Sequence, residues 1–147
     1  MKPRTNSPFP KWLMLAVLIS ALSLGTAQAQ VAVIAHKSVA SGSVDNSTLL
    51  DMFTLNTKNW GDGGKITVID FKNDSPSRTR FYAALGTSFV EMQRTWLRKQ
   101  FSGKAQPPLL LGSDDEILSK VASTPGAIGY VSADKVSKDV KVLATIK

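Results

Sequence analysis

Short apolar runs alternate with segments of helical periodicity, and this alternation restricts the fold more than any other feature of the chain. Val31–Ala35, Lys65–Phe71 and Ala127–Val131 are apolar or β-branched runs of strand length. Helical segments with one apolar face lie between them. Strands that alternate with helices predict an α/β fold in which a mixed sheet is flanked by helices.

Helix-capping and helix-ending residues predict where the other elements begin and end. Ser113–Glu116 has the pattern of a capping box, in which the serine hydroxyl accepts a backbone N–H and the glutamate reaches back. Asn46 or Ser47 is predicted to cap a helix, and Gly86 is predicted to end one. The elements predicted in this way are helices over residues 47–53, 77–85, 88–101 and 113–123 and strands over 109–111 and 140–146.

The segment 88–101 has an amphipathic pattern. One face is predicted to be apolar and the other charged: Phe89, Met92, Trp96 and Leu97 form the first, and Glu91, Arg94, Arg98 and Lys99 the second. The basic residues of the charged face form a cluster with Lys104. We interpret this cluster as a solvated helix face, because a nucleic-acid surface would interleave exposed aromatic side chains. No nucleic-acid partner is therefore expected.

The first 29 residues have the pattern of a secretory signal peptide. Lys2, Arg4 and Lys11 give a positive region, an apolar run of thirteen residues follows over 12–24, and Ala27–Ala29 is a small-x-small cleavage site. A membrane-spanning helix would need about 20 apolar residues. We expect cleavage after Ala29, which leaves residues 30–147 as one α/β domain. This domain is expected to be exported, most simply into a bacterial periplasm.

The composition excludes several kinds of site. The chain has no cysteine and one histidine, which excludes disulfides, thiolate metal sites, cysteine nucleophiles and multi-histidine metal sites. His36 is interpreted as a loop histidine, because no nucleophile motif or partner acid accompanies it. No enzymatic activity, metal or cofactor is expected. Removal of residues 1–29 lowers the formal net charge from +7 to +4, a mild excess that suits an anionic ligand.

Two glycine-rich segments are interpreted as turns. Trp60–Gly64 needs a positive φ angle and leads into a strand, and it lacks the carboxylates of a calcium loop. Thr124–Tyr130 precedes a strand, whereas a nucleotide-binding glycine loop connects a strand to a helix.

The segment Asp70–Phe81 carries the strongest indication of a binding site. In this segment a strand ends, a polar loop follows and a helix begins, and helix N-termini bind oxyanions through unpaired N–H groups. Serine and threonine hydroxyls and basic side chains accompany this helix start, and an aspartate could accept from a protonated phosphate oxygen. The candidate ligand-binding residues are Lys72, Asp74, Ser75, Ser77, Arg78, Thr79 and Arg80.

An ordinary capped helix is the alternative interpretation of the same segment. In that case Ser77 is the N-cap and the side chains of Arg78 and Arg80 lie in solvent. The residues themselves leave both interpretations open.

The order of motifs resembles the periplasmic phosphate-binding protein family, the substrate-binding component of phosphate ABC transporters. The resemblance covers residues 31–136. The segments that carry it are Leu49–Phe53, Asn59–Gly63, Ile66–Ile69, Ser77–Phe81, Trp96, Phe101–Gly103, Ser113–Glu116 and Pro125–Val131.

The resemblance implies one lobe of a type II periplasmic-binding-protein-like fold, whereas family members have two lobes that clamp the anion. In the family a Ser-Gly-Thr sequence at a helix N-terminus holds phosphate, with an arginine upstream. Ser77 and Thr79 match the serine and threonine, Arg78 stands at the glycine, and Lys72 or Asn73 lies near the expected arginine.

These features support two hypotheses. The first is an exported domain that binds phosphate or a similar small oxyanion, with weak and salt-sensitive affinity because one lobe leaves the anion partly in water. A membrane transporter, or a second copy that rebuilds the two-lobed cleft, would be its partner. The second is a non-catalytic periplasmic adaptor module that keeps the fold without tight phosphate binding, and an exposed apolar patch would favour it.

Overall fold

The computed structural model describes residues 29–147, and the predicted signal peptide lies outside these residues apart from Ala29. The predicted strands and helices are present with small shifts at their ends, and a short 3-10 helix, η2, is added. The elements are β1 (Val31–Ala35), α1 (Asn46–Phe53), β2 (Thr67–Phe71), α2 (Pro76–Ala84), α3 (Phe89–Phe101), β3 (Leu109–Leu111), α4 (Asp114–Ser123), β4 (Ala127–Ser132), η2 (Ala133–Lys135) and β5 (Lys141–Ile146).

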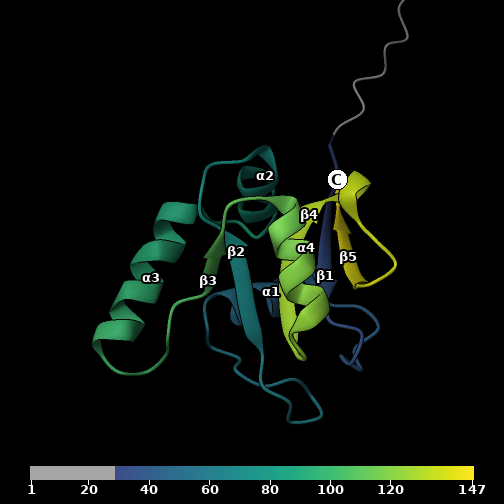
Figure 1. Cartoon of the computed structure of the whole chain (residues 1–147). Helices are drawn as coiled ribbons and strands as arrows, with labels where there is room; N and C mark the ends of the chain where they lie inside the picture. The colour runs from purple at the N-terminus through teal and green to yellow at the C-terminus, as the bar shows by residue number, and fades with distance from the viewer. Residues whose placement is uncertain (1–28) are drawn as a thin grey trace, which may run out of the picture.

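The five strands form one mixed sheet in the order β3-β2-β4-β1-β5. β2 runs parallel to both β3 and β4, whereas β1 runs antiparallel to β4 and β5. The carboxyl ends of β2, β3, β4 and β5 therefore lie along one edge of the sheet, the upper edge in Figure 1. The helices α2 and α4 both begin at this edge, which makes it the natural place for a ligand.

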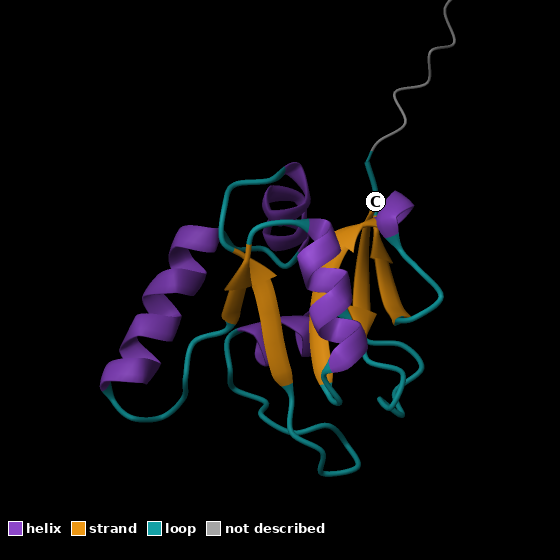
Figure 2. Ribbon diagram, viewed as in Figure 1, coloured by secondary structure: helices purple, strands orange, loops and turns teal. Residues whose placement is uncertain are grey.

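Helices cover both faces of the sheet, as Figure 2 shows. α4 lies on one face, where Ile117 and Val121 are buried, and α1 and α2 lie on the other. On the second face, Phe81 stacks on Tyr130 with ring centroids 4.0 Å apart, and Phe53 packs on Phe81 at 4.7 Å. All five residues of β1 are buried, because this strand has a neighbour on each side and a helix layer on each face. Within residues 29–147, no helix has the length and apolar content needed to cross a bilayer.

Two predicted N-caps are wrong. α2 is capped by Ser75, whose Oγ accepts from the Arg78 N–H at 3.0 Å, and not by Ser77. Pro76 occupies the first helical position. A backbone N–H there would have no partner within the helix, so the absence of an N–H in proline costs no helical hydrogen bond. α1 is capped by the carboxylate of Asp45, which accepts from the Thr48 N–H at 2.8 Å, and not by Asn46 or Ser47.

The capping box of α4 is confirmed with one difference. Ser113 Oγ accepts from the Glu116 N–H at 3.2 Å. The Glu116 carboxylate accepts from the N–H of Gly112 at 2.7 Å, one residue before the expected partner. The first turn of α4 is thereby fixed directly after the carboxyl end of β3.

α3 packs against α1 through Trp96, whose Nε1 donates to the Phe53 carbonyl at 2.7 Å. Met92 and Trp96 are buried as predicted. The prediction for Leu97 is wrong, because its side chain is 49% exposed. Each helical residue advances about 100°, so Leu97 has already turned away from the face that Trp96 buries.

Gly126 lies in the turn before β4 and contacts the segment that leads into β2. Its φ angle is +77°, and a Cβ atom here would lie 2.2 Å from the Lys65 carbonyl oxygen. Its own carbonyl accepts from the Trp60 indole N–H at 2.9 Å and from the Thr67 N–H at 3.2 Å. A side chain at this position would separate the two segments. The turn predicted at Trp60–Gly64 is confirmed, with Gly63 at a positive φ of 89°.

We expect the substitution Gly126→Ala to lower the free energy of unfolding by at least about 2 kcal/mol, because the left-handed backbone and the contact with Lys65 both oppose a Cβ atom. Gly42→Ala is the matched control, since no atom lies within 4 Å of the added methyl group, and it should change stability by less than about 0.5 kcal/mol. Urea denaturation of both variants measures the difference, and equal stability would contradict the packing role of Gly126.

Candidate functional site

Two helix N-termini meet the carboxyl edge of the sheet, and they differ in charge. The first turn of α4 carries Asp114, Asp115 and Glu116, so its own carboxylates offset the positive end of its dipole. The first turn of α2 carries no acidic residue. An anion is therefore better accommodated at the start of α2 than at the start of α4.

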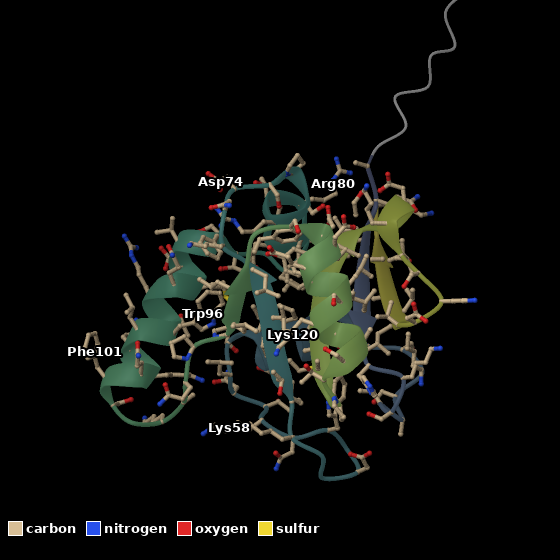
Figure 3. The ribbon with its side chains drawn as sticks, in the orientation of Figure 1. Lys58, Asp74, Arg80, Trp96, Phe101 and Lys120 are labelled. Carbon is tan, nitrogen blue, oxygen red and sulfur yellow. The ribbon has the colours of Figure 1, made fainter. Side chains whose placement is uncertain are left out.

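A hollow of about 820 Å³ runs along α2 from its N-cap to its last turn. It brings together four predicted site residues, Asp74, Ser75, Thr79 and Arg80, and Figure 3 shows Asp74 and Arg80 at this end of the molecule. Ser77, Arg78 and Lys72 do not line it. The full lining is Asp74, Ser75, Pro76, Thr79, Arg80, Ala83, Ala84 and Lys147.

Lys147 is a residue that the sequence analysis missed. It follows β5, whose carboxyl end lies at the same edge as the start of α2. The two segments are far apart in the chain, and only the strand order brings them together. No local motif around Lys147 could have indicated this position.

The start of α2 offers hydroxyl groups and one amide. Ser75 Oγ accepts the capping bond, and its own O–H remains able to donate. The Arg78 and Thr79 N–H groups bond within the helix start, to Ser75 Oγ and to the Ser75 carbonyl at 3.1 Å. Pro76 has no N–H, which leaves the Ser77 N–H as the amide without a hydrogen bond inside residues 29–147.

The basic residues of the segment take different positions. Arg80 is half-buried at the hollow, and within the described part of the chain it forms no ion pair. Lys72 is exposed on the loop after β2, outside the hollow. Arg80 and Lys147 are therefore the cations that the hollow itself presents.

The Arg78 side chain turns inward, in contrast to the solvent-facing position of the capped-helix interpretation. Its guanidinium is paired with the Asp74 carboxylate and lies 3.6 Å from the centre of the Phe89 ring. It also donates to the carbonyls of Phe71 at 3.4 Å and Lys72 at 3.5 Å. These contacts connect the loop after β2 to α2 and α3. Arg78 therefore stabilises the conformation of this loop from its buried side.

Asp70 is a second functional candidate that the sequence analysis left out. It is fully buried, and its carboxylate accepts from the Tyr130 hydroxyl at 2.5 Å, from the Phe71 N–H at 2.7 Å and from the Tyr82 hydroxyl. These contacts join β2, β4 and the last turn of α2. An aspartate inside an apolar strand run was the available signal, because a buried carboxylate needs partners.

Burial raises the pKa of Asp70 above its ordinary value of 3.8, while the hydrogen bonds from Tyr130, Tyr82 and Phe71 and the charge of Arg78 oppose this rise. Burial also raises the pKa of Tyr82 and Tyr130, and the charge of Asp70 adds to the effect. Both hydroxyl groups therefore stay protonated and donate to the carboxylate.

His36 lies in a turn where its Nδ1 accepts from the Ser38 N–H at 3.0 Å and lies 2.8 Å from Ser38 Oγ. Residues 29–147 contain no cluster of metal-ligating side chains.

The chain is similar in fold to solved structures that are described as phosphate transport proteins. One neighbour, described as a phosphate ABC transporter substrate-binding protein with bound phosphate from Clostridium perfringens, superposes with a TM-score of 0.65 at 21% identity over 78% of this chain. An ABC-type phosphate transport receptor from Vibrio cholerae gives 0.62 at 19% identity over 78% of the chain. PstS from Borrelia burgdorferi gives 0.56 at 17% identity over 79%.

The fold is that of one lobe of a periplasmic-binding-protein-like receptor. The chain spans 45%, 46% and 47% of the lengths of these three structures. This confirms the predicted fold class and the predicted resemblance at the level of the fold. No family model matches the chain, and no curated protein matches it in sequence.

Replacement Asp70→Asn should change the pH dependence of stability. A raised pKa in the folded state stabilises the fold below the ordinary pKa near 3.8, and this contribution is lost as the pH rises through the folded pKa. The free energy of unfolding of the variant minus that of the parent should therefore become more positive from pH 4 to pH 7. Asp139→Asn, at an exposed position, should give a smaller change. A difference independent of pH would contradict the assignment.

Proposed function

We propose that the hollow along α2 binds phosphate or a similar small oxyanion. The observation that carries the proposal is the contrast between the two helix starts at the carboxyl edge: α4 carries its own carboxylates, whereas α2 has none and presents hydroxyl groups beside Arg80 and Lys147. Ser75 and Thr79 supply hydroxyl donors, and the two cations supply charge. Lys72, on the exposed loop above, adds positive potential.

Beside the predicted match of Ser77 and Thr79 with the receptor family, we infer a second one. Because Ser75 is the N-cap of α2, Ser75 and Ser77 would stand at the serine and threonine, and Pro76 at the glycine. Arg78 and Asp74 then act as the pair that fixes the loop, while Arg80 contacts the anion. Thr79 is placed in the same hollow one turn into the helix.

Binding should be weak and sensitive to salt, because the hollow is open to water along one side of a single lobe. Attraction between exposed charges is several-fold smaller than in a closed cleft and is screened by ions. The nearby Asp74 carboxylate is already paired with Arg78, which limits its repulsion of an anion. A second lobe, supplied by another copy of the chain or by another protein, would strengthen binding by excluding water.

Isothermal titration calorimetry of residues 30–147 with phosphate at low salt should give a dissociation constant on the order of 1 mM. Arg80→Gln should weaken binding about tenfold, because it removes a charge-assisted contact. Arg94→Gln removes the same charge from the exposed surface of α3 and serves as the matched control. Absence of binding at tens of millimolar phosphate, or equal effects of the two substitutions, would reject the site.

We propose that residues 1–29 direct export to the periplasm, where a membrane transporter would be the natural partner of an oxyanion receptor. The charged start, the apolar run and the small residues at 27 and 29 support this proposal. On expression of the full chain in a Gram-negative host, the periplasmic fraction should contain a protein that begins at Gln30. Ala29→Arg should block this cleavage, and recovery of an uncleaved parent chain from the cytoplasm would refute export.

An adaptor role is the second candidate, and one observation favours it. The exposed large apolar side chains include Val90, Leu97 and Phe101, all of them on α3. This apolar surface lies away from the hollow along α2, so it could serve a partner that has no connection with an oxyanion.

A further inference from the structure

α3 carries apolar residues on two opposite faces. Phe89, Met92 and Trp96 face the body of the protein, and Met92 and Trp96 are buried. On the other face Val90 is 55% exposed, Leu97 49% and Phe101 86%. A surface helix normally places polar residues opposite its buried face, so this second apolar face is unusual. We name it the outer strip of α3.

The outer strip has a regular geometry. At about 100° per residue, Val90, Leu97 and Phe101 lie within about 40° of one another around the helix, roughly opposite the buried Met92. The strip extends for about 16 Å, given a rise of about 1.5 Å per residue. Figure 3 shows Phe101 at the margin of the molecule, at the end of α3, with its side chain directed outward.

Arginines flank the outer strip on one side. Arg94 and Arg98 are exposed and follow the apolar residues at helical spacing, about 20° to 60° from Phe101 around the axis. The one acidic residue of α3 is Glu91, and its carboxylate accepts from Arg94 Nη1 at 2.7 Å. After this pairing the strip still presents an excess of positive charge.

We propose that the outer strip of α3 binds the surface of an anionic lipid bilayer, with Phe101 entering the interface and Arg94 and Arg98 contacting lipid phosphates. An apolar helix face bordered by cations is the arrangement that lies flat in the headgroup region of a membrane. The binding is peripheral and reversible, because the apolar area is small.

The shape of this surface favours a bilayer over a protein partner. Phe101 projects from the end of a helix at the edge of the molecule, where it can enter a soft planar surface. The exposed Arg94 and Arg98 lie along the helix beside the apolar side chains, where they can contact several phosphate groups of a headgroup layer. The proposal does not depend on the hollow along α2, and either can fail without the other.

Co-sedimentation with vesicles tests the proposal. Residues 30–147, which contain the whole described fold except Ala29, should bind phosphatidylcholine vesicles that contain phosphatidylglycerol and should not bind phosphatidylcholine alone. Binding should fall at least fivefold with Phe101→Ser and at least tenfold with the double variant Arg94→Gln, Arg98→Gln. High salt should release the protein, as expected for attraction to an anionic surface.

Matched controls lie elsewhere on the surface. Val142→Ser removes an apolar side chain that is 40% exposed on β5, and Lys135→Gln with Lys138→Gln removes two exposed charges. Neither should change vesicle binding, and Arg80→Gln should leave it intact. Addition of free phosphate should have no more effect than a chloride salt of equal ionic strength, which distinguishes a lipid surface from a soluble anion site.

Insertion can be observed directly with Phe101→Trp. Its indole emission should shift to shorter wavelength with anionic vesicles and be quenched by brominated lipid, while Trp60 and Trp96 remain buried in the protein. Thermal unfolding confirms that each variant is folded. The proposal is overturned if the parent protein does not bind anionic vesicles at low salt, or if the strip variants bind as well as the controls.

Discussion

The buried carboxylate of Asp70 is the contact on which the upper edge of the sheet depends. It lies in β2, and it accepts from Tyr130 of β4 and Tyr82 of α2. A carboxylate removed from water is costly unless it is hydrogen-bonded, so these partners are required wherever Asp70 is buried. The last turn of α2 is consequently fixed relative to two neighbouring strands.

The two helices that start at this edge, α2 and α4, differ in the charged residues of their first turns. Two carboxylates of α4 form contacts within the protein: Asp114 accepts from the Ser132 N–H and Glu116 accepts from the Gly112 N–H. Asp74 is likewise paired with Arg78. Because these three acids take part in internal contacts, Arg80 and Lys147 supply the positive charge at the hollow.

The sequence predicted the elements well, because strand runs and amphipathic periods are local signals. It did not place the caps of α1 and α2, since Asp45, Ser47, Ser75 and Ser77 are all good capping residues and only the backbone angles select among them. It did not show that Arg78 turns inward over Phe89, or that Lys147 reaches the hollow, because both depend on contacts made by the folded chain. Leu97 was misplaced because it sits at the border of the buried face.

The pairing of the first strand with the last has a consequence for how such a unit can be combined with others. Val31, at the start of β1, lies opposite Ile146, at the end of β5, so the chain enters and leaves this domain at adjacent points. A unit with this property can be spliced into a host polypeptide as a self-contained insertion, because neither joint needs to stretch or to cross the sheet. Larger receptors could thus contain this lobe as a module whose fold is independent of the lobe beside it.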